Sequence, residues 1–125
     1  MDRNLRGDFV EVFVIMRLME QGLRVAIPYG QTKGLDLLVE NKHKKWRRIQ
    51  VKSAQKKPDG RYRVHLVQGN PSSGRRRYIN KEFDYLIAAA PDDDKFWIFP
   101  FSFIKGKSCL SVSPRREEGW KLLEK

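Results

Sequence analysis

An acid, an amide and an amine, Asp36, Gln50 and Lys52, lie in two neighbouring segments that both have the alternation of a β-strand. In residues 34–40 a period of two sends apolar side chains to one face and Asp36 to the other. In residues 46–54 the same alternation separates the apolar side chains from Gln50 and Lys52. If the two strands pair as a hairpin with their apolar rows in register, the three polar side chains meet on one side of the sheet. Such a cluster could hold a divalent cation and a phosphate group.

A fourth polar residue belongs to a helix that the sequence predicts over residues 5–21. Asn4 is the expected N-cap and Gly22 the expected stop, and the residues between them are mostly apolar. Glu11 lies within an apolar stripe of this helix. Because burying a carboxylate without a partner is costly, Glu11 should reach a polar cavity or have a shifted pKa, unless it simply escapes at the helix rim.

The spacing of these residues resembles the active site of the PD-(D/E)XK nuclease superfamily. There an Asp opens one strand, and an acid, any residue and a Lys follow on the next; Asp36 matches the Asp and Lys52 the Lys. Two positions depart from the pattern, because Gln50 replaces the acid and Leu35 replaces a Pro. With a Gln at this position, the chain looks most like the branch of the superfamily that includes endonucleases encoded within group I introns. The resemblance covers about residues 5–100 in the order of elements.

The resemblance implies Mg²⁺-dependent hydrolysis of a DNA phosphodiester bond. In such a site Asp36, Glu11 and the side-chain oxygen of Gln50 would hold Mg²⁺, which polarises the phosphate and lowers the pKa of an attacking water. Lys52 would orient that water or neutralise charge developing on the phosphate. The resemblance therefore makes Glu11, Asp36, Gln50 and Lys52 the expected catalytic residues.

Positive charge is concentrated in the segment that joins and follows the two strands. Residues 42–63 contain ten Lys or Arg and one acid, Asp59. Basic side chains interleaved with Trp46 and Tyr62 are typical of phosphate contacts with some stacking, although a charge run can also be a solvated face. The irregular segment 68–80 carries three further Arg residues and is either a DNA-engaging loop or a flexible loop with incidental charge. The expected DNA-binding residues are Lys33, Lys42, Lys44, Lys45, Arg47, Arg48, Lys56, Lys57, Arg61, Arg63, Arg75, Arg76 and Arg77.

The charge balance of the whole chain agrees with a polyanionic partner. Among 125 residues, 26 Lys and Arg outnumber 15 acids, giving a formal charge of +11 and a pI of about 10.0. Nucleic acid is the first candidate for this partner and an anionic membrane surface the second. The single cysteine, Cys109, excludes an internal disulfide framework and an all-Cys zinc site. The sequence has no signal-peptide core and no apolar run near the roughly 20 residues of a membrane span, so we expect a cytoplasmic protein.

The other segments complete an α/β domain. Residues 23–27, 61–67, 85–90 and 96–99 are expected strands, and residues 116–124 an expected closing helix. We expect one domain, residues 1–125, with a restriction-endonuclease-like fold: a mixed central sheet of about five strands flanked by helices, with the first helix packed across it. The acidic triplet 92–94 lies on a turn and lacks the spaced oxygen ligands of a calcium loop, so we assign no metal to it.

Three functions remain in competition at this stage. The first is an endonuclease of the intron-encoded, homing type. The second is a structure-specific nuclease that resembles Holliday junction resolvases. The third is a basic DNA-binding module whose nuclease site has decayed, a reading that Gln50 favours and that the presence of Asp36, Lys52 and Glu11 opposes. Because cutting both DNA strands generally needs two active sites, we expect a homo-oligomer.

Overall fold

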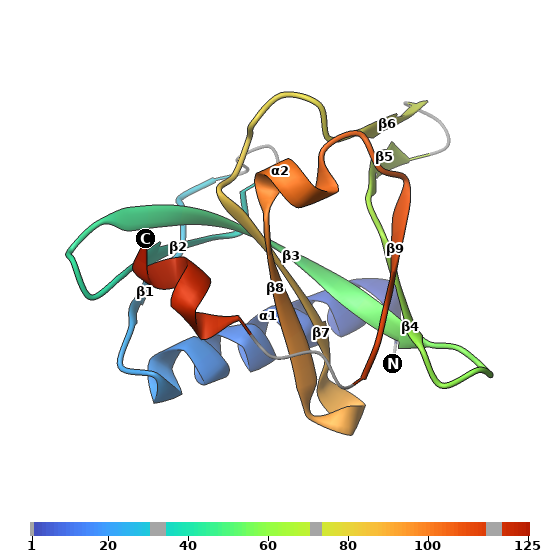
Figure 1. Cartoon of the computed structure of the whole chain (residues 1–125), viewed down its shortest axis with the longest axis horizontal. Coiled ribbons are helices and arrows are strands. Elements are labelled where there is room, and N and C mark those ends of the chain that lie inside the picture. Colours follow the sequence, from blue (N-terminus) through green and yellow to red (C-terminus); the bar gives the residue numbers. More distant parts are fainter. Residues whose placement is uncertain (1, 31–34, 71–73, 115–118) are drawn as a thin grey trace.

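The computed structural model describes residues 2–30, 35–70, 74–114 and 119–125, with the backbone alone described at residues 68–70 and 74–76. Figure 1 shows one long helix crossing behind a twisted sheet. The helices are α1 (Arg3–Glu20), the short α2 (Phe101–Ile104) and two 3₁₀ turns, η1 (Pro91–Asp93) and η2 (Trp120–Glu124). The strands are β1 (Arg24–Ala26), β2 (Leu37–Glu40), β3 (Trp46–Lys56), β4 (Tyr62–His65), β5 (Val67–Asn70), β6 (Gly74–Arg77), β7 (Tyr85–Ala90), β8 (Lys95–Pro100) and β9 (Cys109–Val112).

The main sheet of the described residues is mixed, as expected. It contains seven strands, a larger number than the five or so expected. Strand β3 pairs antiparallel with β2 and β4 and parallel with β7, while β1, β9 and β8 extend the sheet at its edges. The outer strands β1 and β9 are short, with three and four residues, and β1 confirms the strand expected at residues 23–27.

Helix α1 covers one face of the sheet. Val10, Val14 and Leu18 on its inner side pack with alternate residues of β3, including Ile49 and Val51, in one continuous apolar cluster. The expected packing of the first helix across the sheet is therefore confirmed.

The ends of α1 differ in how well the sequence predicted them. The N-cap is Asp2, whose Oδ1 accepts a hydrogen bond from the Leu5 amide at 2.8 Å, so the prediction of Asn4 was wrong. Gly22 follows the helix with φ of 80°, a conformation that other residues adopt only with strain, and its role as the stop is confirmed.

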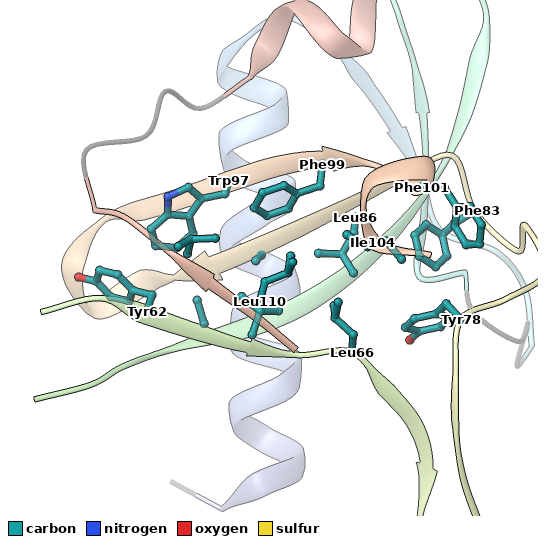
Figure 2. Packing of buried hydrophobic residues seen from close by; sticks show 14 of the residues in the cluster. Tyr62, Leu66, Tyr78, Phe83, Leu86, Trp97, Phe99, Phe101, Ile104 and Leu110 are labelled. Carbon is teal, nitrogen blue, oxygen red and sulfur yellow. The ribbon is translucent and has the colours of Figure 1, made fainter. Parts of the chain in front are cut away.

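The opposite face of the sheet holds a second, more aromatic core. Figure 2 shows Tyr62 and Trp97 at one end of this cluster and Tyr78, Phe83 and Phe101 at the other. Strands β4 and β9 contribute their inward residues to it, as the alternation of residues 61–67 predicted. The sheet is thus buried on both faces along β3 and β7, which holds these two strands rigidly.

Two expectations about irregular segments need correction. The backbones of residues 67–70 and 74–77 form the antiparallel pair β5–β6, although the abundance of Gly, Ser and Arg had indicated an irregular loop over residues 68–80. The expected closing helix is a 3₁₀ turn over residues 120–124 in the described part of the chain, and Leu123 anchors it with 1% of its surface exposed.

The acidic triplet between β7 and β8 makes structural contacts. Asp92 forms an ion pair with Arg6 at 3.0 Å, Asp93 accepts a hydrogen bond from the Tyr62 hydroxyl at 2.7 Å, and Asp94 pairs with Arg17. The contact with Asp93, followed by burial, raises the pKa of Tyr62 to about 12. These acids join the β7–β8 turn to α1 and β4.

Among the described residues, none of the helices combines the length and apolar character that a membrane crossing requires.

Candidate active site

The candidate site lies on β3 between the residues that pair with β2 and those that pair with β4. Along one edge, β2 pairs with β3 as far as Ile49, and β4 begins to pair only at Ala54. The intervening stretch of β3 is held on its other edge by the parallel strand β7, from Ile49 to Ser53. The sheet therefore opens at residues 50–53 on one edge, and this opening contains Gln50 and Lys52.

Asp36 fills part of this opening. The register that pairs Leu37 with Ile49 places Asp36 next to Gln50, as the apolar rows predicted. Asp36 Oδ2 accepts a hydrogen bond from the Val51 amide at 2.8 Å and from Gln50 Nε2 at 2.7 Å. The carboxylate thus satisfies a backbone amide that the departure of β2 would otherwise leave without a partner in the sheet.

The Gln50 amide group presents its nitrogen to the acid. Its side chain is 8% exposed, and Nε2 also donates to the Val51 carbonyl oxygen at 3.2 Å. The resemblance implied instead that the Gln50 oxygen serves as a metal ligand. In this arrangement Gln50 stabilises the charged form of Asp36, and ligation through its oxygen would require the amide to turn over.

Glu11 approaches the same acid from α1. Burial first, and then the negative charges of Asp36 and Asp8, raise the pKa of Glu11. The shifted pKa expected for an acid in the apolar stripe is therefore found. Two carboxylates within electrostatic range in a partly buried site repel each other, and a bound divalent cation would relieve that repulsion.

Lys52 extends from β3 on the same side as Gln50. Burial lowers the pKa of Lys52, and the attraction of Asp36 opposes this change without cancelling it. Its Nζ lies 5.7 Å from the centre of the Tyr78 ring, within range of a cation–π contact. Sequence reasoning did not identify Tyr78, because no spacing rule connects a residue near position 78 with strand β3.

The donor set fits a hard divalent cation with few protein ligands. Glu11 and Asp36 supply carboxylate oxygens, the ligands that Mg²⁺ prefers, and Mg²⁺ commonly retains several waters beside one or two carboxylates. Among the described residues there is no group of three or more His, Cys, Asp or Glu side chains arranged around a common point, so additional ligands would have to be amide, backbone or water oxygens.

The expected DNA-binding residues separate into two groups at opposite ends of β3. The eleven residues of this strand span about 35 Å at roughly 3.3 Å per residue. Residues 42–48 lie at its start, and residues 56–63 lie at its end and on β4. The candidate site at Gln50 and Lys52 lies between the two groups.

Several of these basic side chains have partners within the protein. Arg48 binds Asp84 with Nη2 to Oδ1 at 3.2 Å, and Lys42 pairs with Glu124 at 3.0 Å. Arg47 Nη2 donates to the Lys125 carbonyl oxygen, and Arg61 Nη2 donates to the Ser111 carbonyl oxygen at 3.0 Å.

The remaining predicted contacts are of three kinds. Four are exposed on the described surface without an ion pair there: Lys44, Lys45, Lys56 and Arg63. Lys57 is half-buried, and the exposed Arg77 reaches the Gly106 carbonyl oxygen at 3.4 Å. Lys33 and the side chains of Arg75 and Arg76 lie outside the described residues.

A pocket of about 580 Å³ lies beside the first basic group and away from Asp36. Its lining includes Arg47, Lys81, Lys105 and Ser102, with Asp84 at one side. Sequence reasoning missed Lys81 and Lys105, because each is an isolated charge in its own segment and the fold alone brings them together.

Comparison with known proteins identifies this arrangement. Among solved structures, the chain is similar to a bacterial homing endonuclease, I-Ssp6803I, with a TM-score of 0.82 and 26% sequence identity over 99% of this chain and 94% of that one. No curated protein matches the chain by sequence. The family described as PD-(D/E)XK endonuclease matches residues 1–119, nearly the full length, and includes the helix, strands and site built above. The chain that places Glu11, Asp36, Gln50 and Lys52 around the opening in its sheet therefore belongs to the PD-(D/E)XK endonuclease family.

Proposed function

We propose that the protein is a Mg²⁺-dependent endodeoxyribonuclease of homing-endonuclease type, which hydrolyses phosphodiester bonds in duplex DNA. The observation that carries this proposal is that Asp36, Gln50 and Lys52 lie together at the opening of the sheet. Glu11 interacts electrostatically with Asp36 there. Family membership and the likeness to a homing endonuclease support the same activity. We expect the protein to act in the cytoplasm.

Each side chain of the site would have a distinct role in the hydrolysis. Asp36 and Glu11 would hold Mg²⁺, and Gln50 would keep Asp36 oriented through the 2.7 Å hydrogen bond to its Oδ2. Bound Mg²⁺ would supply Lewis acidity toward the phosphate and a more acidic water. Lys52 would hold the attacking water or balance charge on the phosphate, and its lowered pKa makes proton exchange easier than for an exposed lysine.

The two basic groups suit a duplex that lies along β3. Their separation of about 35 Å is close to one turn of B-DNA, about 34 Å, so both groups could contact phosphates of one duplex with the site between them. Lys44 and Lys45 at one end and Lys56 and Arg63 at the other are the strongest candidates, because they are exposed. Cleavage of both strands would need two sites and hence a homo-oligomer.

The decisive experiment compares DNA substrates and metal conditions. Purified protein is incubated with supercoiled plasmid, with genomic DNA fragments from its own source and with a four-way junction, each with Mg²⁺ or with a chelator. We expect Mg²⁺-dependent cutting of duplex at a restricted set of positions. Preferred cutting of the junction would favour the resolvase-like alternative, and tight DNA binding without cutting of any substrate would favour the non-catalytic module.

A further inference from the structure

The ammonium group of Lys52 lies in a partly buried site where few groups compensate its charge. Within the described part of the chain, Lys52 Nζ forms no ion pair and no hydrogen bond. The negative charge of Asp36 acts to raise the pKa of Lys52, but burial has the larger effect and lowers it. Because a charge that leaves water without a partner is costly, this ammonium should move towards an acid within reach. Asp36 is the acid that attracts it, yet the two side chains are not paired.

The ring of Tyr78 takes the place of a hydrogen-bonding partner for this ammonium. Lys52 Nζ lies over the ring, 5.7 Å from its centre, where the negative face of an aromatic system attracts a cation. This attraction is stronger where water is excluded, and Tyr78 is 2% exposed. The ring therefore gives the ammonium a position apart from Asp36.

The fold holds the Tyr78 ring in a fixed place. The Tyr78 carbonyl oxygen accepts a hydrogen bond from the Gly106 amide at 2.8 Å, which ties the chain between β6 and β7 to the segment after α2. The ring packs edge-on against Phe83 with centroids 5.1 Å apart, and Phe83 packs in the same way against Phe101. Figure 2 shows the three rings together at one end of the aromatic core. A ring enclosed in this way has little freedom to move, so it fixes where the ammonium is held.

The position of the ammonium decides what Asp36 can bind. Asp36 Oδ2 already accepts hydrogen bonds from the Val51 amide and from Gln50 Nε2. If the Lys52 ammonium paired with the same carboxylate, it would occupy lone pairs that remain and offset the charge that attracts a divalent cation. The amine would then also be held away from a water or phosphate at the site. Separation of Lys52 from Asp36 keeps both groups available.

We propose that Tyr78 is a positioning residue, whose ring holds the Lys52 ammonium apart from Asp36 so that the carboxylate stays open to Mg²⁺ and the amine to the substrate. This inference rests on the roles proposed above for Asp36 and Lys52 in cleavage. The contact between ring and amine, and its effect on Mg²⁺ binding, can both be measured in protein that is not cutting DNA.

A small set of variants separates the effect of the ring from that of packing. Tyr78→Leu and Tyr78→Met remove the ring and keep an apolar side chain, whereas Tyr78→Phe keeps the ring. Phe101→Leu is the matched control, because Phe101 is a buried aromatic of the same cluster whose described ring contact is with Phe83. Circular dichroism melts establish the temperature range in which each variant is folded.

NMR spectra of the protein without metal or DNA test the contact itself. Protons that lie over the face of an aromatic ring are shifted upfield by the ring current. We expect this shift for the ε-methylene protons of Lys52 in the wild type, in Tyr78→Phe and in Phe101→Leu, and its loss in the variants without the ring. Equal shifts in the wild type and Tyr78→Leu would overturn the proposal, whether or not the protein cuts DNA.

Calorimetric titration with Mg²⁺ tests the consequence for Asp36. We expect Tyr78→Leu to bind Mg²⁺ about tenfold more weakly than the wild type, because the released amine competes for the carboxylate, and Tyr78→Phe to bind it as the wild type does. In the double variant Tyr78→Leu, Lys52→Ala the competing amine is absent, so the affinity should equal that of Lys52→Ala alone. A loss that persists in the double variant would mean that the Tyr78 substitution acts through packing, and the proposal would be wrong.

Single-turnover cleavage connects the contact with the proposed activity. We expect Tyr78→Leu to cut DNA about tenfold more slowly than the wild type, with an unchanged dissociation constant for DNA, and Tyr78→Phe to cut at the wild-type rate. An active wild type whose rate Tyr78→Leu leaves unchanged would contradict the positioning role and leave the proposed function intact. A wild type that cuts no substrate would instead contradict the proposed function, and the NMR and calorimetric results would still decide the role of Tyr78.

Discussion

At Asp36, burial and hydrogen bonding act on the pKa in opposite directions. Burial raises the pKa, while the Val51 amide and the charge of Lys52 lower it, and burial prevails. Because a metal ligand must be deprotonated, the affinity for Mg²⁺ should begin to fall at a higher pH than for an ordinary carboxylate of pKa about 4. A bound cation would therefore stabilise the charged form of Asp36, which burial disfavours.

Replacement of Asp36 or Lys52 should remove cleavage and preserve DNA binding. Asp36→Asn keeps an oxygen that can accept from the Val51 amide but lacks the charge that holds Mg²⁺, and Lys52→Ala lacks the amine. We expect each variant to cut DNA more slowly by on the order of a hundredfold or more, with a dissociation constant for DNA within a few fold of the wild type. Single-turnover cleavage and fluorescence anisotropy measure the two quantities, and wild-type cutting by either variant would mean that the site is elsewhere.

Gln50→Glu should tighten Mg²⁺ binding and destabilise the metal-free protein. The substitution replaces an N–H donor 2.7 Å from Asp36 Oδ2 by a carboxylate. Two such charges repel by about 4 kcal/mol at 4 Å and an effective dielectric near 20, which raises the pKa of Asp36 and is relieved by a divalent cation. Calorimetric titration with Mg²⁺ and melting curves with and without Mg²⁺ check both effects. An unchanged Mg²⁺ affinity would show that position 50 does not face the metal.

Among the elements, β3 has the central part in positioning the site. Its first part pairs with β2, its last with β4, and its middle with the parallel strand β7 alone. The opening that receives Asp36 exists because the two antiparallel neighbours do not meet. The junction of β3 and β7 is itself secured by Asp84, which accepts from the Arg48 amide at 2.7 Å and pairs with the Arg48 guanidinium.

Asp84→Ala should therefore weaken the fold in a pH-dependent way. Burial raises the pKa of Asp84, but the hydrogen bonds and charge of Arg48, with Lys81, outweigh it and lower the pKa overall. A lowered pKa means that the stabilisation is present above the unfolded-state pKa of about 4 and is lost as the pH falls through the lower, folded-state value. We expect a loss of about 2 kcal/mol at pH 7, typical of hydrogen bonds to a charged group, and a smaller loss near pH 3. Urea unfolding of the variant and the wild type at both pH values measures this difference, and an equal loss at both would exclude the charge of Asp84 as its source.

At the scale of the whole molecule, the basic residues that give the net charge of +11 differ in whether they have partners within the protein. Arg47, Arg48, Lys42 and Arg61 have partners within the protein, whereas Lys44, Lys45, Lys56 and Arg63 are exposed on the described surface without an ion pair there. The exposed group is available to displace counterions from a nucleic acid, and the paired group is less so.

DNA binding should accordingly weaken steeply with salt. Each phosphate contact adds about 0.9 to the slope of log affinity against log salt concentration. We expect the double variant Lys44→Ala, Lys45→Ala to reduce this slope by about 1 to 2, while Arg48→Ala, the matched control, changes the slope little and lowers stability instead. Anisotropy titrations between roughly 50 and 200 mM salt measure the slope, and a wild-type slope near zero would remove nucleic acid as the partner.

Local rules were sufficient to predict the parts of the site that depend on one strand or one helix. The alternation of side chains along β3 and the apolar rows of the hairpin placed Asp36 beside Gln50, because a period of two is a property of the strand itself. Gly22 was recognised as the helix stop for the same reason, since a positive φ is a local requirement. The family was also identified from these few residues and is confirmed over residues 1–119.

Only the tertiary structure decided the features that depend on distant segments. The hydrogen bond from Gln50 Nε2 to Asp36, in place of a free amide oxygen, follows from the packing around both residues. The pairing of Arg48 with Asp84 joins residues 36 positions apart and gives a side chain that we expected to contact DNA a partner within the protein. The sequence of α1 likewise shows apolar residues almost all round, and only its packing reveals which face covers the sheet and which is left exposed at Val12. In each case the deciding free energy comes from contacts between segments, which no pattern within one segment can contain.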